Sequence, residues 1–419
     1  METIQKKSVI IIGGGFAGLA AAKVFADEPE VHVTLLDKRN HHLFQPLLYQ
    51  VATAGLNPAD IAVPIRAQFS KVSNVEVHLA QAQKIDLKEK NVVLEKGVLA
   101  YDYLIVCCGA EDSYFGHDSW EDFAPGLKSI EQATEIRRRL LLAFEEAENC
   151  TDEETQKALL TFVIVGGGAT GVELAGAIAD LSRTVLVQDF KKINPADAQV
   201  ILVEAGPRLL PAFKEVLSQR VVEDLIQLGV QVKTSTLVEE IGKDGVRVGA
   251  ELIRSRNVIW AAGVKASSLE FFPEIAKEKS GKVRVTESFS LSDYPEVFVI
   301  GDMAAFKLNE KQWLPGLAPA AIQAGRYVAK NILNRLRGNS SAPFRYIDKG
   351  QMATIGKHLA VGQFANITFT GYFAWLAWLF VHIFYLIGFK NRAFVLIQWT
   401  WSYLFSKRGA RLITRRDWK

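Results

Sequence analysis

The 419-residue chain has few cysteines and almost no excess of either charge. Its three cysteines, Cys107, Cys108 and Cys150, show no metal-ligand spacing and no CxxC pair. A disulfide between the adjacent pair would strain the backbone, so the thiols predict a reducing compartment. Forty-nine basic against 46 acidic residues leave a net charge of +3, which argues against a nucleic-acid-binding protein. We therefore expect neither a metal site nor a nucleic-acid partner.

Disordered and low-complexity stretches are also scarce. Only residues 338–342, GNSSA, resemble a linker. Because a single core stops growing near about 250–300 residues, a chain of this length predicts more than one domain. The short polar segment before residue 8 lacks the features of a signal peptide, which predicts residence on the cytoplasmic side.

Glycine is concentrated in two similar loops. The first, Gly13-x-Gly15-x-x-Gly18, lies between an apolar run, Ser8–Ile12, and an alanine-rich helical segment. The spacing is typical of a dinucleotide site, where glycines permit a tight turn, the approach of a pyrophosphate and close helix–strand packing. A second apolar run, residues 31–36, ends in Asp37, whose carboxylate is placed to bind an adenosine ribose.

The second loop, Gly166-x-Gly168-x-x-Gly171, repeats these parts. It follows the predicted strand Thr161–Val165, and the predicted strand Gln199–Val203 ends in Glu204. Glu204 lies 33 residues after Gly171, so an insertion near residues 184–198 must interrupt the unit. A carboxylate here would repel a 2′-phosphate, which predicts NADH rather than NADPH, although Arg208 is close in sequence.

Two further segments indicate which loop holds a permanent cofactor. Residues 100–110, AYDYLIVCCGA, are similar to the YDxLIxATG segment of flavoproteins with two dinucleotide-binding domains. Residues 297–304, VFVIGDMA, resemble their second FAD motif, in which Asp302 would bind the ribityl hydroxyls, with a helix N-cap as the alternative role. A helix is predicted to begin near Pro319, with its positive end toward the flavin.

The order of these segments predicts an NADH domain inserted into a FAD domain. The fold class is α/β, with two Rossmann-like domains as in glutathione-reductase-like flavoproteins, plus C-terminal membrane-associating helices. The predicted boundaries are 1–115 and 291–345 for the FAD-binding domain, 116–290 for the NADH-binding domain and 346–419 for the membrane-anchoring and quinone-access region.

The segment 41–58, where relatives of this fold carry a redox cysteine pair, contains no cysteine. This excludes dithiol chemistry and a sulfide oxidase with several reactive cysteines. His41 and His42 lack an evident partner, so each is either functional or a satisfied loop histidine. Glu173, two residues after Gly171, either complements the helix dipole or manages protons near the flavin.

The C-terminal region is the most apolar and aromatic part of the chain. Residues 371–389 form a 19-residue run without formal charge, about 28 Å long as a helix, and residues 390–392 are expected to break it. A shorter apolar run, 393–405, precedes a tail with six basic residues between 407 and 419. This pattern predicts a lipid-binding region, with a buried hairpin or a dimer interface as alternatives. The absence of a charged face favours deep insertion of the first helix slightly over a position in one leaflet.

Nearly the whole chain resembles a type II NADH:quinone oxidoreductase, the single-subunit respiratory NADH dehydrogenase that pumps no protons. The matching motifs include both glycine loops, FQPLLYQVATAG, VIWAAGVKA, DKGQMATIGKHLAVGQF and the aromatic tail. The resemblance implies noncovalent FAD, hydride transfer from NADH and two-electron reduction of a membrane quinone, either ubiquinone or menaquinone. It also implies monotopic attachment to the cytoplasmic face of the inner membrane through residues 371–419, and a homodimer.

The resemblance also implies site residues. Glu173 and Gln323 match positions assigned to proton transfer and to the quinone site. The positions that match cofactor-binding ones on the FAD side are Gly13, Gly14, Gly15, Phe16, Ala17, Gly18, Asp37, Lys38, Gln45, Ala82, Gly109, Asp302, Ala320 and Ala321. On the NADH side they are Gly166, Gly168, Gly171, Glu204 and Gly263.

The sequence departs from the family pattern at Pro319, which replaces the first glutamine of an AQxxxQ motif. This removes one expected side-chain contact to the flavin or the quinone. Two other functions remain open on the residues alone. One is a soluble NADH-dependent flavin or quinone reductase, and the other is a flavoprotein whose reduction by NADH switches a protein interaction.

Overall fold

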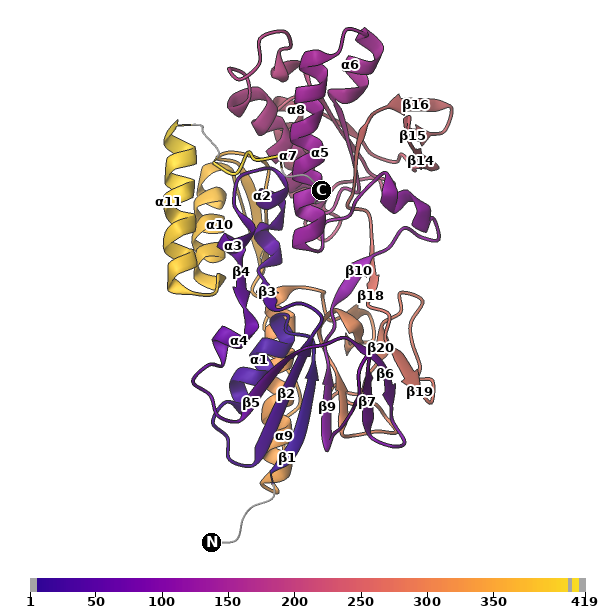
Figure 1. Cartoon of the computed structure of the whole chain (residues 1–419), viewed down its shortest axis with the longest axis vertical. Coiled ribbons are helices and arrows are strands. Elements are labelled where there is room, and N and C mark those ends of the chain that lie inside the picture. Colours follow the sequence, from indigo (N-terminus) through magenta and orange to yellow (C-terminus); the bar gives the residue numbers. More distant parts are fainter. Residues whose placement is uncertain (1–5, 406–408, 414–419) are drawn as a thin grey trace. The chain divides into compact units, whose positions relative to one another are not determined.

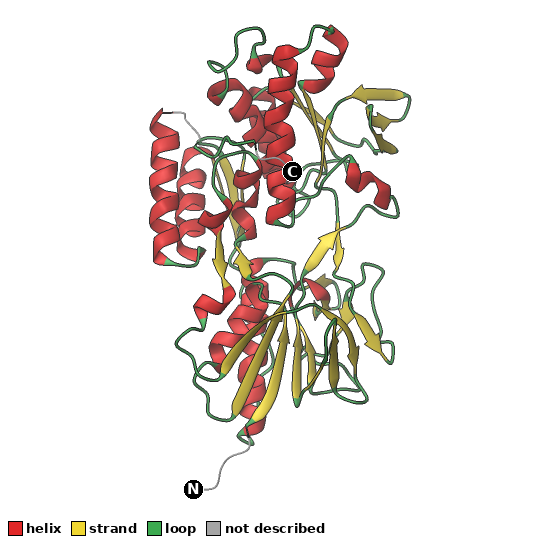
Figure 2. Cartoon of the chain, viewed as in Figure 1, coloured by secondary structure: helices red, strands yellow, loops and turns green. Residues whose placement is uncertain are grey.

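The structure is a computed structural model that describes residues 6–405 and 409–413. The chain folds into two compact units, drawn in Figures 1 and 2. Unit 1 comprises residues 1–43, 62–111 and 264–349, and unit 2 comprises residues 44–61, 112–263 and 350–419. Most of the predicted basic tail, residues 406–408 and 414–419, lies outside the described residues. The predicted domain boundaries stay a prediction, because the grouping into units does not assign a ligand to either unit.

Unit 1 is built on a five-stranded parallel sheet. The β-branched and leucine-rich strands inside this sheet are buried on both faces, as expected for a parallel sheet covered by helices, whereas the edge strand, residues 75–79, is exposed at alternate residues. In sheet order the strands are β21 (Val297–Val299), β9 (Tyr103–Val106), β1 (Lys7–Ile12), β2 (Val31–Asp37) and β5 (Val75–Leu79). The strands predicted at residues 8–12 and 31–36 are thus confirmed.

Helices α1 (Phe16–Phe25) and α9 (Ala318–Leu336) pack against each other in unit 1 (Figure 1). Their approach is close because Gly325 of α9 has no side chain, and a Cβ there would lie 2.2 Å from the Ala17 carbonyl oxygen. The helix predicted to begin near Pro319 is confirmed, with Pro319 in its first turn.

The remaining strands of unit 1 lie at its periphery. An antiparallel sheet joins β6 (Ala82–Asp86), β7 (Asn91–Leu94) and β8 (Val98–Ala100), with β19 (Glu270–Phe272) parallel to β6. Strand β3 (His41–Leu43) pairs antiparallel with β4 (Ala62–Pro64), and the short helix α4 (Ile65–Gln68) follows β4. Short pairs are β20 (Val283–Arg284) with β22 (Ala304–Ala305) and β23 (Lys307–Asn309) with β24 (Gln312–Trp313).

Unit 2 contains the second parallel sheet. In sheet order its strands are β13 (Val230–Lys233), β12 (Gln199–Val203), β11 (Thr161–Val165) and β17 (Asn257–Trp260). The strands predicted at 161–165 and 199–203 are confirmed. The helices of this part of unit 2 are α5 (Ile130–Asn149), α6 (Glu153–Leu159), α7 (Ala169–Asp180) and α8 (Glu215–Gln227). A separate antiparallel sheet contains β14 (Glu240–Gly242), β15 (Gly245–Val248) and β16 (Glu251–Arg254). Strands β10 (Ala110–Asp112) and β18 (Val264–Ala266) lie where the chain passes between units.

The C-terminal part of unit 2 forms a three-stranded antiparallel sheet and a helical hairpin. The strands are β25 (Gln351–Thr354), β26 (Ala360–Phe364) and β27 (Ile367–Thr370), and the helices are α10 (Gly371–Tyr385) and α11 (Phe389–Phe405). Helix α10 packs on this sheet, and α11 packs on α10 and on the short helix α3 (Pro58–Ile61), which follows α2 (Leu48–Ala52).

The predicted 19-residue helix is wrong in its extent. Helix α10 ends at Tyr385 after 15 residues, and the break lies at residues 386–388 instead of 390–392. Gly388 has a φ of +90°, a conformation that glycine adopts at low cost, whereas Lys390–Arg392 continue inside α11. Among the described residues, no helix is long and apolar enough to cross a membrane.

The contact between α1 and α9 gives a stability prediction. Gly→Ala inside a helix is normally stabilising by about 1 kcal/mol. For Gly325→Ala we expect the opposite sign, a loss of about 1–3 kcal/mol, because the methyl group would meet the Ala17 carbonyl. Denaturant unfolding measures this, with Lys330→Ala on the exposed side of α9 as the control. Stabilisation by Gly325→Ala would contradict the observed packing.

Candidate functional site

The loop between β1 and α1 brings the three predicted glycines together. Gly13 has a φ of +111°, and a Cβ there would lie 2.3 Å from the Cys107 carbonyl oxygen. A Cβ on Gly18 would lie 1.8 Å from the Gly13 carbonyl oxygen. Gly15 precedes α1 and faces open space. The backbone geometry thus requires glycine at 13 and 18, and it leaves room beside Gly15 for an anion at the helix N-terminus.

Asp37, at the end of β2, holds this loop. Its Oδ2 accepts a hydrogen bond from the Gly14 N–H at 2.6 Å, and its Oδ1 accepts one from the Arg39 N–H at 2.7 Å. Each carboxylate oxygen can accept a further bond. Asp37 can therefore orient the loop and still bind a ligand hydroxyl.

The two neighbouring cysteines serve packing. The Cys107 thiol donates to the Gly13 carbonyl oxygen at 3.2 Å and is buried behind the loop. Burial raises the pKa of the Cys107 thiol well above its ordinary value and that of Cys108 to about 12. Since the thiolate is the reactive form, neither cysteine is activated for redox chemistry.

Asp302 follows β21 and is half-buried. It caps no helix: Ile300 precedes the short 3-10 turn 301–303, and Leu317 precedes α9 without a side-chain cap bond. Within the described residues its carboxylate has no hydrogen-bond partner, and its Oδ1 lies 3.1 Å from where a Gly316 Cβ would be. Asp302 therefore does not serve as the helix N-cap that the sequence left open, and its carboxylate is available to a ligand in unit 1.

Gln323, on α9, is held at both ends of its amide. Nε2 donates to the Ile347 carbonyl at 3.0 Å, and Oε1 accepts from the Ile347 N–H at 2.9 Å. One N–H and one lone pair remain for another partner. Upstream in the same helix, Ala320 is buried and Ala321 is half-buried.

The other predicted flavin-side positions are spread over both units. In unit 1, the Phe16 ring meets the His42 ring edge-on at 4.9 Å, and Gly109 has a φ of +76°. Lys38 is exposed and Ala82 is half-buried at the start of β6. Gln45 belongs to unit 2, where its Nε2 donates to the Lys128 carbonyl at 3.4 Å.

The second glycine loop repeats the first in unit 2. Gly166 has a φ of +113°, and a Cβ there would lie 2.5 Å from the backbone of Ala261. A Cβ on Gly171 would lie 1.8 Å from the Gly166 carbonyl oxygen, and Gly168 faces open space. Gly263 packs against the Phe115 ring. The two loops therefore share their backbone geometry as well as their sequence pattern.

Glu204 occupies the place that Asp37 has in unit 1. Its Oε2 accepts from the Gly167 N–H at 2.5 Å, and its Oε1 accepts from the Gly206 N–H at 2.6 Å. The Arg208 guanidinium is engaged elsewhere, donating to the carbonyls of Phe213 and Pro211 and to the Ser218 hydroxyl. The arginine that could have favoured a 2′-phosphate is thus held by the protein itself.

Glu173 is the fifth residue of α7, just past the first turn in which the sequence places it, and its Oε1 accepts from the Thr354 N–H at 3.5 Å. Burial raises the pKa of this carboxyl to about 8, and the bond from Thr354 opposes the shift. A carboxyl with this pKa holds its proton near neutral pH, which suits a group that donates or receives one.

Sequence reasoning missed the network beside this acid. The Tyr49 hydroxyl is 3.0 Å from the Thr354 hydroxyl and accepts from Gln50 Nε2 at 3.0 Å. Gln50 Oε1 in turn accepts from the indole N–H of Trp399 at 2.8 Å. No spacing could have signalled the network, because its members come from three distant segments of the chain.

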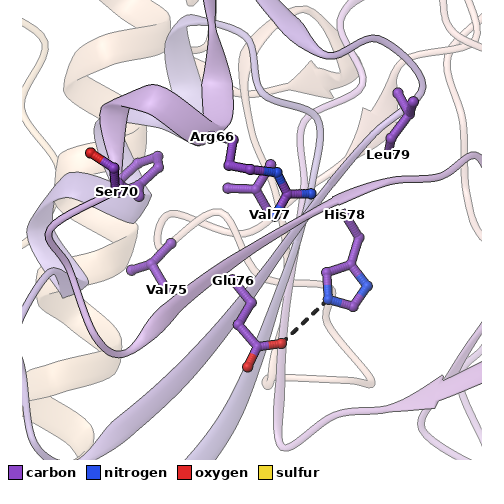
Figure 3. Close-up of a pocket in the computed structure, with 8 residues that line it drawn as sticks. Arg66, Ser70, Val75, Glu76, Val77, His78 and Leu79 are labelled. Atoms are coloured by element: carbon purple, nitrogen blue, oxygen red, sulfur yellow. Dashed lines mark hydrogen bonds and ion pairs between the residues drawn. The ribbon is translucent and has the colours of Figure 1, made fainter.

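A surface depression in unit 1 contains none of the predicted residues (Figure 3). It is formed by α4, the following residues and β5, and Figure 3 shows the contact between Glu76 and His78, 3.3 Å apart, among its lining residues. Its lining residues are Arg66, Phe69, Ser70, Val75, Glu76, Val77, His78 and Leu79.

Two family models match the chain. The model for pyridine nucleotide-disulphide oxidoreductases matches residues 7–325, and the model for the NDH2 C-terminal domain matches residues 349–408.

The chain is also similar to characterised proteins along most of its length. It is 42% identical to type II NADH:quinone oxidoreductase Ndh of Mycobacterium tuberculosis, over 98% of this chain and 91% of that protein. It is 30% identical to type II NADH:quinone oxidoreductase of Staphylococcus haemolyticus, over 88% of this chain and 92% of that protein.

Solved structures show the same fold. The structure of NDH2 from Plasmodium falciparum in complex with NADH has a TM-score of 0.89 at 21% identity, covering 98% of this chain and 100% of that one. The sulfide:quinone oxidoreductase of Aquifex aeolicus has a TM-score of 0.70 at 21% identity, covering 95% and 91%.

The raised pKa of Glu173 gives a prediction for stability against pH. Between about pH 4.5 and 8 the unfolded chain ionises this carboxyl while the folded chain keeps it protonated, so its contribution to stability falls as pH rises. Glu173→Gln should melt at least about 2 °C above the parent at pH 8–9, and the two should converge toward pH 4.5. Thermal unfolding across pH measures this, with the exposed Glu145→Gln as the control. A difference independent of pH would contradict the assignment.

Proposed function

The chain belongs to the type II NADH:quinone oxidoreductases, and from this premise we propose that unit 1 binds the flavin as FAD and unit 2 binds NADH. The protein is an oxidoreductase that passes electrons from NADH through a flavin to a quinone. One observation carries the assignment of the sites: each unit has its own glycine loop with an acid bonded to the N–H of the residue between the first two motif glycines, Gly14 or Gly167. A single dinucleotide would need only one such loop.

In unit 1 the proposed FAD site uses the residues that the loop geometry leaves available. Backbone N–H groups near Gly15 receive the pyrophosphate, Asp37 receives the adenosine ribose and Asp302 receives the ribityl hydroxyls. Gly13 and Gly18 supply the turn and the packing. The bound flavin supplies acceptance of a hydride and release of two electrons to the quinone.

In unit 2 we assign Gly166, Gly168 and Gly171 to the NADH pyrophosphate and Glu204 to its ribose. Glu173 keeps a proton on its carboxyl near neutral pH and can deliver it where quinol formation needs one. In unit 1, Gln323 retains an N–H and a lone pair for the quinone headgroup. Pro319 has no side-chain amide, so it cannot make the contact that the first glutamine of the family motif would make.

We also propose that α10 and α11 attach the protein to the cytoplasmic face of the inner membrane without spanning it. Helix α10 turns Ala374, Trp375 and Trp378 into the protein. The large apolar residues left exposed on this hairpin include Phe373 (80%), Phe380 (74%), Phe384 (60%), Phe389 (87%), Ile397 (65%) and Trp401 (56%). A contiguous apolar surface of this kind indicates a binding surface, and we assign it to lipid and to the interface of a homodimer.

The proposed electron transfer is tested by anaerobic reduction of the purified protein. NADH should bleach the flavin absorbance within the mixing time, and addition of a ubiquinone or menaquinone analogue should restore it with formation of one quinol per NADH. A flavin that stays reduced after quinone addition would favour the alternative of an NADH-responsive switch.

The nucleotide preference depends on Glu204. In Glu204→Arg the charge repulsion against a 2′-phosphate is removed and a cation takes its place, so the ratio of kcat/KM for NADH over NADPH should fall at least about tenfold. Steady-state kinetics with both nucleotides measures the ratio. Arg208→Ala is the comparison, and it should leave the ratio near the parental value because its side chain is engaged within unit 2.

The lipid surface is tested by replacing Phe373, Phe380 and Phe384 together with serine. Flotation with anionic phospholipid vesicles should show binding weakened by at least about tenfold, because three phenyl groups lose their apolar contacts. Leu237→Ser, at a residue 67% exposed elsewhere in unit 2, is the control. Unchanged flotation together with dissociation of a dimer in sedimentation would assign these residues to a protein interface instead.

A further inference from the structure

The residue between the first two motif glycines, Gly14 in one loop and Gly167 in the other, is held through both its backbone N–H and its carbonyl. In both loops an acid at the end of a strand receives the glycine N–H, from Gly14 at 2.6 Å and from Gly167 at 2.5 Å. The carbonyl ends differ. The Gly167 carbonyl accepts from the backbone N–H of Leu210 at 2.8 Å, whereas the Gly14 carbonyl is 3.0 Å from Nδ1 of the His42 ring.

The contact with a carbonyl determines which nitrogen of the His42 ring carries the proton. A carbonyl can only accept, so Nδ1 carries the proton and Nε2 has the lone pair. The side chain is 2% exposed, and Nε2 has no hydrogen-bond partner among the described residues. Burial lowers the pKa of the ring to about 4, so the ring stays neutral and keeps this tautomer at physiological pH.

His42 reaches Gly14 from a separate segment of unit 1. It lies in β3, opposite Val63 of β4, and Ile65 follows that strand. The Ile65 side chain also packs on the loop, since a Cβ on Gly14 would lie 2.3 Å from its Cδ1. This strand pair and the residue after it therefore contact Gly14 twice, through the hydrogen bond of His42 and the apolar side chain of Ile65.

A buried polar ring with one unpartnered nitrogen is costly, and an apolar side chain of similar shape would avoid that cost. The second loop shows that the backbone alone can hold the equivalent carbonyl. The histidine must therefore contribute something that a packing residue would not, and its one described hydrogen bond is to the glycine loop.

We propose that His42 is a positioning residue for the flavin, which fixes the peptide group between Gly14 and Gly15 so that the backbone N–H groups near Gly15 face the pyrophosphate. This inference rests on the assignment of the flavin to unit 1. It makes flavin retention depend on a second side chain besides Asp37, whereas in the proposed NADH loop the backbone of Leu210 holds the equivalent carbonyl.

The test compares flavin affinity in His42→Phe and His42→Asn. The phenyl group fills the space of the ring without a donor, and the asparagine Nδ2 can replace the Nδ1–H. After removal of the bound flavin, titration of the full chain with FAD should show a dissociation constant raised about tenfold in His42→Phe. In His42→Asn it should stay within about threefold of the parent. His41→Phe, the matched change at the preceding residue, should bind FAD like the parent.

Equal affinity in the parent and His42→Phe would overturn the proposal, as would equal weakening in both variants. NADH binding to the flavin-free protein separates a local effect from general damage: it should be unchanged, and a parallel loss would also overturn the proposal. Because FAD affinity is measured directly, a parent that binds FAD without reducing quinone would contradict the proposed function and leave the test of His42 intact.

Discussion

Both halves of the structure depend on the hydrogen bond between a carboxylate and the N–H that follows the first glycine of a loop. Asp37 with Gly14, and Glu204 with Gly167, join the end of one parallel strand to the turn after its neighbour. A carboxylate is the side chain that can hold this N–H and still accept from a ribose hydroxyl. The same bond therefore stabilises the turn and prepares the site, which explains why two units with different neighbours share one local geometry.

The two loops differ in what surrounds them. In unit 1 the loop is backed by Cys107 and held by His42, and the half-buried Asp302 offers a second carboxylate. In unit 2 the corresponding supports are backbone atoms of Ala261 and Leu210, and the acid close to the loop is Glu173. Side-chain supports such as Cys107 and His42 suit a ligand that stays, whereas the backbone atoms that take their place in unit 2 suit one that exchanges.

The sequence predicted the parts of the site that depend on local chemistry. Strand, turn and helix follow one another within a few residues in each loop, so glycine spacing and apolar periodicity were sufficient to predict them. The contacts of His42 and Tyr49 could not be predicted, because their partners Gly14 and Thr354 are distant in sequence and no repeating pattern relates these positions. The end of α10 differs from the prediction for another reason: the charge of Lys390 suggests a break there, but the chain turns earlier, at Gly388, which adopts a positive φ at low cost.

The helical hairpin of α10 and α11 has two apolar sides, one buried in unit 2 and one exposed. One side packs Trp375 and Trp378 onto unit 2, while the other leaves phenylalanines exposed. From the buried side, hydrogen bonds run from Trp399 through Gln50 and Tyr49 to Thr354, whose N–H faces Glu173. Since all of these groups belong to unit 2, the helix proposed to touch lipid and the acid proposed to handle protons share one hydrogen-bonded core. Loss of the Tyr49 hydroxyl would leave buried polar groups unpaired on both sides of it, so the position of Glu173 is tied to the packing of α11.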